Sequence, residues 1–141
     1  MTAPLSGQAP SLGLVFLGGI AGAIVRYTVD EALPTTPTGF PWATFLINLS
    51  GAFLLGLLLE SLALSGEDQG WRKRIRLLVG TGLLGTYTTY SSLAVELDLL
   101  IHHDRVVLGL GYGAASLLLG LAAALAGVAL ANAVRRKEVS A

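Results

Sequence analysis

Four apolar stretches separated by short polar segments dominate the pattern of this chain, and they predict four membrane-spanning helices. The predicted spans cover residues 12–33, 42–64, 75–100 and 106–134. Residues 42–59, 77–95 and 106–134 contain no charged side chain, and about 20 apolar residues in a helix cross the hydrocarbon core of a bilayer. The short connections place the four helices in one transmembrane domain over residues 1–141. The expected fold class is therefore an all-α membrane protein.

The first ten residues, MTAPLSGQAP, contain no basic residue ahead of the first apolar stretch. The stretch itself is long and ends without a typical cleavage site. We therefore expect a short tail followed by a retained helix, rather than a signal peptide.

The third span is interrupted by residues 80–92, GTGLLGTYTTYSS, which are rich in glycine and hydroxyl side chains. Glycine lowers helix stability, and hydroxyl side chains compete for backbone hydrogen bonds. We therefore expect the third helix to be broken in the middle of the membrane. Backbone groups freed by a break are tolerated only where protein covers them or where they line a wet cavity or an ion site. A close helix crossing built on small residues is the alternative interpretation.

Small residues also recur along the fourth span, at Gly109, Gly113, Gly120, Ala124 and Gly127. Much of this spacing is typical of a helix that crosses a neighbouring helix closely. We therefore expect the fourth helix to pack tightly against another span.

Composition agrees with membrane insertion. Hydrophobic residues make up 53% of the chain and charged residues 13%, with a mean hydropathy of +0.70; soluble domains carry about 25% charged residues. The chain has no cysteine, which excludes disulfides and thiolate chemistry. Its formal net charge is zero, so it has no general attraction to nucleic acid, and no such partner is expected.

Basic residues are distributed unevenly between the two expected sides of the membrane. With four spans, both termini and the loop of residues 65–76 lie on one side, which carries seven of the nine Lys and Arg residues. Cytoplasmic loops are enriched in Lys and Arg. We therefore expect a multi-pass protein of the cell (plasma) membrane with both termini in the cytoplasm.

Polar side chains inside the spans are mostly neutral hydrogen-bond donors. They are Asn48, Thr88, Thr89, Tyr90, Ser91, Ser92, Tyr112 and Ser116. No nucleophile–base pair, metal-ligand spacing or phosphate-binding loop accompanies them, so we expect no enzymatic activity. Neutral donors suit a dehydrated anion, because they stabilise it without trapping it as a fixed positive charge would. The Asn48 amide can instead join two helices by a hydrogen bond.

Charged residues occur near the ends of the spans. Arg26 can snorkel to the interface with Asp30 or Glu31 as its partner, or it can attract anions from a water-filled vestibule. Glu60 and Glu96 lie near predicted span ends, so we expect no carboxylate in the middle of a span. This weighs against a proton-coupled pump and against a small four-helix exporter of the multidrug type, which needs a membrane-embedded glutamate.

Three segments in order resemble the Fluc (CrcB) fluoride channel family. They are GGIAGAIVRY at residues 18–27, FLINLSGAFLLG at residues 45–56 and GLLGTYTTYSSLAVE at residues 82–96. The last segment resembles the family pattern GxxGGFTTFSTFxxE, and the resemblance covers nearly the whole chain. It implies a dual-topology dimer of antiparallel subunits whose two narrow pores let fluoride leave the cytoplasm passively, which relieves fluoride toxicity.

The resemblance also implies roles for individual residues. A structural sodium ion, which is not transported, would lie at the dimer centre on the backbone carbonyls of Gly85 and Thr88. Arg26 would line a vestibule. The fluoride pathway would include Asn48, Thr89, Tyr90, Ser91, Ser92, Leu93, Tyr112 and Ser116.

Several positions depart from the family pattern. Two phenylalanines whose ring edges contact fluoride are replaced by Tyr90 and Leu93, and Gly120 stands where another pore serine is expected. Thr86 replaces a glycine, and Ser92 replaces a threonine. These changes put at least one ion path in doubt, so a non-conducting structural partner is an alternative function.

The uneven charge distribution bears on the second subunit. A chain that pairs antiparallel with itself must insert in both orientations, whereas this charge bias predicts one orientation. A paralogue of opposite orientation that supplies the missing rings is therefore our hypothesis for the partner. An antiparallel homodimer is the alternative.

Overall fold

The computed structural model describes residues 5–140, and side chains over residues 9–137. The elements in order are α1 (Leu5–Ala32), α2 (Trp42–Leu64), α3 (Gly70–Ile75), the π-helix η1 (Arg76–Leu84), α4 (Gly85–Tyr87), α5 (Tyr90–His102) and α6 (Val106–Ser140). No strand occurs within residues 5–140. The all-α class is therefore confirmed.

Three continuous helices are long and apolar enough to cross a membrane: Ala9–Ala32 within α1, Trp42–Leu64, and Val106–Lys137 within α6. The stretch expected to form the third span is divided among α3, η1, α4 and α5. The described residues thus contain three continuous helices of membrane-crossing length and one divided stretch.

Two helices extend beyond the membrane spans expected from the sequence. The first helix begins at Leu5 rather than at residue 12, and the last continues to Ser140 rather than ending at residue 134. Extending an existing helix costs far less than nucleating one, so the flanking polar residues continue the helical backbone. The basic residue Lys137 in the last turn of α6 is also favourable for the helix dipole.

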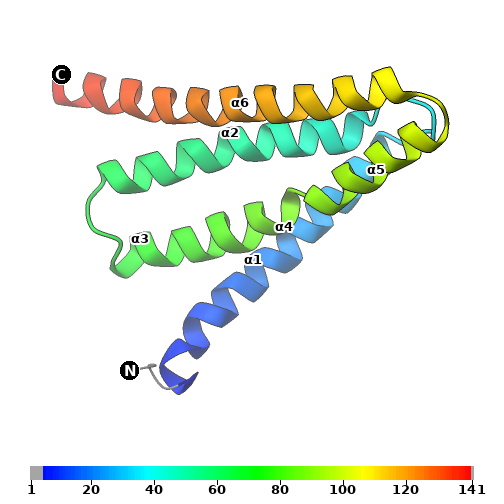
Figure 1. Cartoon of the computed structure of the whole chain (residues 1–141). Coiled ribbons are helices and arrows are strands. Elements are labelled where there is room, and N and C mark those ends of the chain that lie inside the picture. Colours follow the sequence, from blue (N-terminus) through cyan, green and yellow to red (C-terminus); the bar gives the residue numbers. More distant parts are fainter. Residues whose placement is uncertain (1–4, 141) are drawn as a thin grey trace.

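Two helix pairs give the molecule its shape (Figure 1). Helix α2 lies along α6, and α1 runs obliquely past η1 and α4. The α1–α2 and α5–α6 turns lie at one end of the molecule, whereas α3 and the C-terminal end of α6 lie at the other.

Glycine permits the close approach within each pair. A Cβ added at Gly56 of α2 would collide with the backbone carbonyl of Ala124 in α6, and one added at Gly127 would collide with that of Phe53. The close crossing expected for the fourth span is therefore confirmed. In the second pair, a Cβ at Gly18 of α1 would collide with the carbonyl of Leu78 in η1. A Cβ at Gly82, in the first half of the interrupted segment, would collide with the Val15 carbonyl of α1, so this glycine also serves close packing.

The buried core is small. Phe45, Leu93, Leu100 and Tyr112 form its centre, where α2, α5 and α6 meet. Many other large apolar side chains are exposed, including Phe16 on α1 and Leu117 on α6. An apolar surface of this extent needs lipid or another protein around it.

Candidate ion-binding site at the helix interruption

The helical backbone is interrupted between α4 and α5. Thr88 has φ −73° and ψ 154°, and Thr89 has φ −147° and ψ 121°, so both residues are extended. Helix α4 ends just before them at Tyr87, and α5 begins just after them at Tyr90. The second half of the segment that the sequence singled out therefore contains non-helical backbone.

Asn48 of α2 fixes the interruption by two hydrogen bonds to one residue. Its Nδ2 donates to the Thr89 carbonyl at 2.9 Å, and its Oδ1 accepts from the Thr89 amide at 2.8 Å. The side-chain amide therefore replaces the helical partners that Thr89 lacks. Gly51 lies one turn further along α2, and a Cβ there would collide with the methyl group of Thr88. The interrupted segment can approach α2 because Gly51 has no side chain.

Two carbonyl groups lose their usual donors through this arrangement. In a continuous α-helix, Gly85 would accept from the amide of Thr89, and Thr88 would accept from the amide of Ser92. The Thr89 amide donates to Asn48 instead, and the Ser92 amide donates to the Thr89 hydroxyl at 3.2 Å. The carbonyl oxygens of Gly85 and Thr88 are thus left without these donors. Backbone carbonyl oxygens are suitable ligands for a hard cation. These two oxygens therefore fit the sodium ion that the family resemblance implies.

The hydroxyl groups of the segment fall into two sets. Thr86 donates to the carbonyls of Gly82 and of Gly19 in α1, and Thr88 donates to the carbonyl of Leu84. These two hydroxyls therefore serve the preceding turn and the neighbouring helix.

The second set gathers at the start of α5. The Thr89 hydroxyl lies 3.2 Å from the hydroxyls of both Ser91 and Ser92. Thr89 is buried, whereas Ser91 is exposed. Three of the expected pathway residues thus form one hydroxyl cluster beside Asn48.

The structure separates Tyr90 and Leu93, the two residues that replace the family phenylalanines. The Tyr90 side chain is 82% exposed, whereas Leu93 is 9% exposed and packs in the core against Phe45 and Tyr112. In a single chain, the aromatic ring of Tyr90 is therefore exposed on the surface, whereas Leu93 is part of the core.

Glu96 was missed as a site residue. It lies between three helices, where its Oε1 accepts from Thr44 of α2 at 2.6 Å and its Oε2 accepts from Tyr112 of α6 at 2.7 Å. Glu96 lies within α5, near the end of the expected third span, and its carboxylate accepts hydrogen bonds from two neighbouring helices. The hydroxyl groups of Thr44 and Tyr112 on otherwise apolar spans could have indicated a buried acceptor such as Glu96.

Ser116 lies one turn beyond Tyr112 on α6. Its hydroxyl is buried and has no hydrogen-bond partner among the described residues. A buried polar group without a partner is uncommon in folded proteins. Tyr112, Ser116 and Glu96 thus place a second group of polar atoms within the apolar interior.

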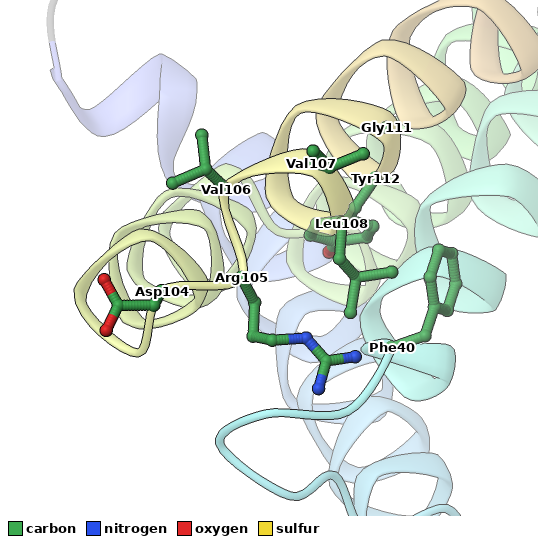
Figure 2. Close-up of a pocket in the computed structure, with 8 residues that line it drawn as sticks. All are labelled: Phe40, Asp104, Arg105, Val106, Val107, Leu108, Gly111 and Tyr112. Carbon is green, nitrogen blue, oxygen red and sulfur yellow. The ribbon is translucent and has the colours of Figure 1, made fainter.

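A pocket of about 620 Å³ opens beside Tyr112 at the α5–α6 turn (Figure 2). The side chains of Asp104 and Arg105 point to opposite sides, and the Arg105 guanidinium points toward Phe40. Arg26 lies elsewhere, on α1, where it is half-buried and forms no ion pair with Asp30 or Glu31 within the described residues. The ion-pair partner suggested for Arg26 by its sequence neighbours is therefore not found.

An all-helical molecule with three long apolar helices and polar groups in its interior is a helical membrane protein. Residues 13–128 match the family described as CrcB-like protein, Camphor Resistance (CrcB). The chain belongs to this family. Family membership identifies the class of protein, so the half-buried Glu96 does not support the alternative of a multidrug-type exporter.

Three relatives of this chain are named as fluoride-specific ion channels. The chain is 48% identical to the fluoride-specific ion channel FluC 2 of Leifsonia xyli, a match that covers 98% of this chain and 95% of that protein. It is 42% identical to fluoride-specific ion channel FluC 1 of Cutibacterium acnes, covering 92% and 90% of the two chains. It is 45% identical to fluoride-specific ion channel FluC of Deinococcus radiodurans, covering 79% and 86%.

Proposed function

We propose that this chain is a subunit of a passive, fluoride-specific ion channel that releases fluoride from the cytoplasm. The observation that carries the proposal is the interruption at Thr88 and Thr89, where a side-chain amide and a hydroxyl cluster meet inside an apolar molecule. The names of relatives that match nearly the full chain support the same function.

The donors at the interruption suit a small anion. Asn48 uses one amide hydrogen on Thr89 and keeps a second one. Ser91 and Tyr90 add exposed hydroxyls beside it. Neutral donors replace part of the water around fluoride and allow it to leave, whereas a fixed cation would hold it.

The structural sodium ion belongs to the same proposal. The carbonyls of Gly85 and Thr88 would hold it, since their helical donors are taken by Asn48 and Thr89. Gly85 is exposed in the single chain, so a second subunit would be needed to complete the coordination. The ion would supply fixed charge and hold the two subunits together.

A dimer is also proposed, because four short helices enclose little volume. The divided stretch from α3 to α5 would form the third of four membrane spans, and the exposed Tyr90 would face the partner. Both termini would lie on the cytoplasmic side of the cell membrane. The partner would be an antiparallel copy or a paralogue; the numbered names of two relatives are in keeping with paired genes.

Fluoride efflux from liposomes tests the function. Vesicles containing the reconstituted chain, loaded with potassium fluoride, should release fluoride when a potassium ionophore is added, and vesicles loaded with potassium chloride should not release chloride. Equal release of both anions would contradict fluoride specificity. No release from the chain alone, together with release after co-reconstitution with a paralogue, would identify a structural partner in a heterodimer.

A further inference from the structure

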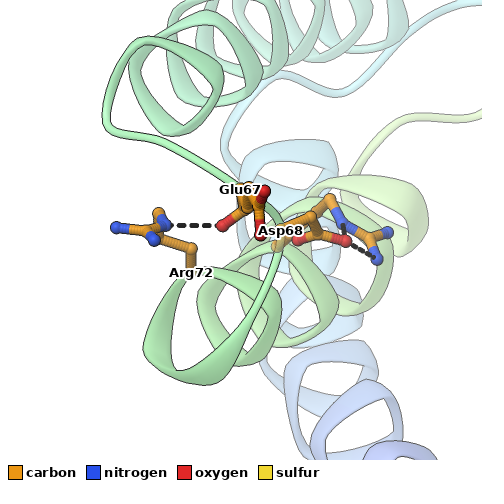
Figure 3. A network of polar contacts seen from close by, with 4 residues as sticks. Glu67, Asp68 and Arg72 are labelled. Atoms are coloured by element: carbon orange, nitrogen blue, oxygen red, sulfur yellow. Dashed lines mark hydrogen bonds and ion pairs between the residues drawn. The ribbon is translucent and has the colours of Figure 1, made fainter.

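The corner between α2 and α3 is exposed to solvent and yet held in one shape. Arg72 donates from Nε to the Glu67 carbonyl at 2.7 Å and from Nη1 to the Ser65 carbonyl at 3.1 Å. Arg76 donates from both Nε and Nη2 to Asp68, at 2.9 Å and 2.6 Å. Figure 3 shows the Arg72 and Asp68 contacts on either side of the loop. These four hydrogen bonds fix the loop against the start of η1.

Positive charge remains uncompensated on this corner. Arg76 is neutralised by Asp68, but the partners of Arg72 are neutral carbonyls. Lys73 and Arg74 are exposed and form no ion pair within residues 9–137. Three neighbouring cations therefore point outward from α3.

A small pocket of about 240 Å³ lies beside Arg72, the first of these cations. Leu59, Leu62 and Ala63 of α2 give it an apolar wall. Arg72, Arg76 and Asp68 line its polar side, where the Asp68 carboxylate is paired with Arg76. The Trp71 ring beside it is 55% exposed, and the Arg72 guanidinium lies 5.6 Å from the ring centroid. The pocket thus joins an apolar surface to a cationic rim within one turn of helix.

We propose that this corner, formed by the end of α2, the loop and α3, binds an anionic phospholipid. The headgroup phosphate contacts Arg72 beside the pocket, Lys73 and Arg74 add positive charge around it, and the glycerol and upper acyl chain occupy the pocket against Leu59 and Leu62. The position favours a lipid, because α2 is an apolar membrane-crossing helix whose end lies at the leaflet surface. Basic pockets next to membrane helices bind anionic headgroups. A nucleic acid would use the cations but not the apolar wall.

The two tryptophans of the chain provide a direct test, because Trp71 belongs to α3 whereas Trp42 is the first residue of α2. Helix α3 and the start of α2 lie at opposite ends of the molecule (Figure 1). In a Trp42→Phe variant, phosphatidylglycerol brominated near the headgroup end of its chains should quench Trp71 more than equally brominated phosphatidylcholine at the same mole fraction. We expect a preference of roughly fivefold for the anionic lipid. In Lys73→Gln/Arg74→Gln on the same background, the preference should fall to about one.

Matched variants distinguish binding of anionic lipid at the α2–α3 corner from a general attraction of anionic lipid to the basic residues of the chain. Arg105→Gln removes one cation at the opposite end and should leave the Trp71 preference unchanged. A Trp71→Phe variant, which reports from Trp42, should quench equally with both lipids. Monodisperse elution and unchanged helical circular dichroism show that each variant is folded.

Two results would overturn the proposal. One is equal quenching of Trp71 by both lipids in the Trp42→Phe chain. The other is a double variant that keeps the full preference for the anionic lipid. Binding of double-stranded DNA to the solubilised chain, lost in the double variant and without lipid preference, would assign the cations to nucleic acid. None of these outcomes depends on fluoride transport.

Discussion

At the scale of single residues, Asn48 determines the backbone of a helix to which it does not belong. It pairs with both the amide and the carbonyl of Thr89, and it thereby withholds a donor from Gly85. Each hydrogen bond of this kind is worth about 1 kcal/mol. Threonine has a lower helix propensity than alanine or leucine, so little intrinsic preference for a continuous helix opposes these bonds.

A prediction at the scale of single residues concerns Gly120. A Cβ added at Gly120 would meet no atom within 4 Å, so the chain has room for the serine that the family pattern expects. Gly120→Ser should leave folding intact or stabilise α6 by about 0.5 kcal/mol. If α6 lines the pathway, it should also raise the fluoride efflux rate. Thermal unfolding and fluoride efflux measure the two effects, and unchanged efflux would remove Gly120 from the pathway.

The sequence indicated which polar side chains need hydrogen-bond partners, but it did not indicate which residues those partners are. An amide inside an apolar span must be satisfied, so Asn48 was recognised as important, but its pairing with Thr89 depends on how α2 and α5 approach. Leu93 and Tyr90 lie three residues apart, yet one is buried and the other exposed. Their orientations follow from the first turn of α5, which the sequence pattern does not specify.

At the scale of elements, the contact between α2 and α6 should be sensitive to a single methyl group. A Cβ at Gly56 collides with the Ala124 carbonyl, whereas a Cβ at Gly111 meets nothing within 4 Å. Gly111→Ala should stabilise the protein by about 1 kcal/mol. Gly56→Ala should destabilise it by about 1–3 kcal/mol. Unfolding in detergent measures both, and stabilisation by Gly56→Ala would show that the helices are further apart than described.

The loop between α2 and α3 should respond to acid. The hydrogen bond from Arg76 lowers the pKa of the Asp68 carboxyl below its usual value. Because the folded pKa is depressed, the stabilisation is complete above the unfolded value of about 3.9 and is lost as the pH falls through the folded pKa. Trp71 emission in a Trp42→Phe variant should therefore shift below about pH 4. Asp68→Asn should show the shifted emission at neutral pH, and a transition identical to that of the parent would contradict the assignment.

Element boundaries were less predictable than element types. Apolar length sufficed to predict the helices that became α1, α2 and α6, since crossing a bilayer requires about 20 apolar residues. The π-helix η1 had no signal in the sequence, because its wider turn accompanies the close contact of η1 with α1 around Gly18. Glycine and hydroxyl content indicated the interruption, and contact with α2 fixed it at Thr88 and Thr89.

At the scale of the whole molecule, charge divides the chain into two ends. The corner of α3 and the end of α6 carry most of the basic residues, whereas Asp98 and Asp104 lie at the opposite turn. We therefore expect insertion in one orientation. A fluorescent protein fused to the C-terminus should fluoresce in the cytoplasm, and alkaline phosphatase fused there should stay inactive. Comparable activity of both fusions would indicate dual topology and favour a homodimer.

In the proposed channel, Asn48 holds open the helix interruption along which fluoride passes. The most direct test is fluoride efflux from liposomes that contain the unaltered chain, Asn48→Ala, or the matched control Asn132→Ala, together with a paralogue if the chain requires one. Asn132 also carries a span amide, but it bonds to Glu60 and the Val128 carbonyl, away from the interruption. We expect Asn48→Ala to slow efflux about tenfold or more and Asn132→Ala to leave it unchanged. Rapid, fluoride-specific efflux through Asn48→Ala would contradict the account.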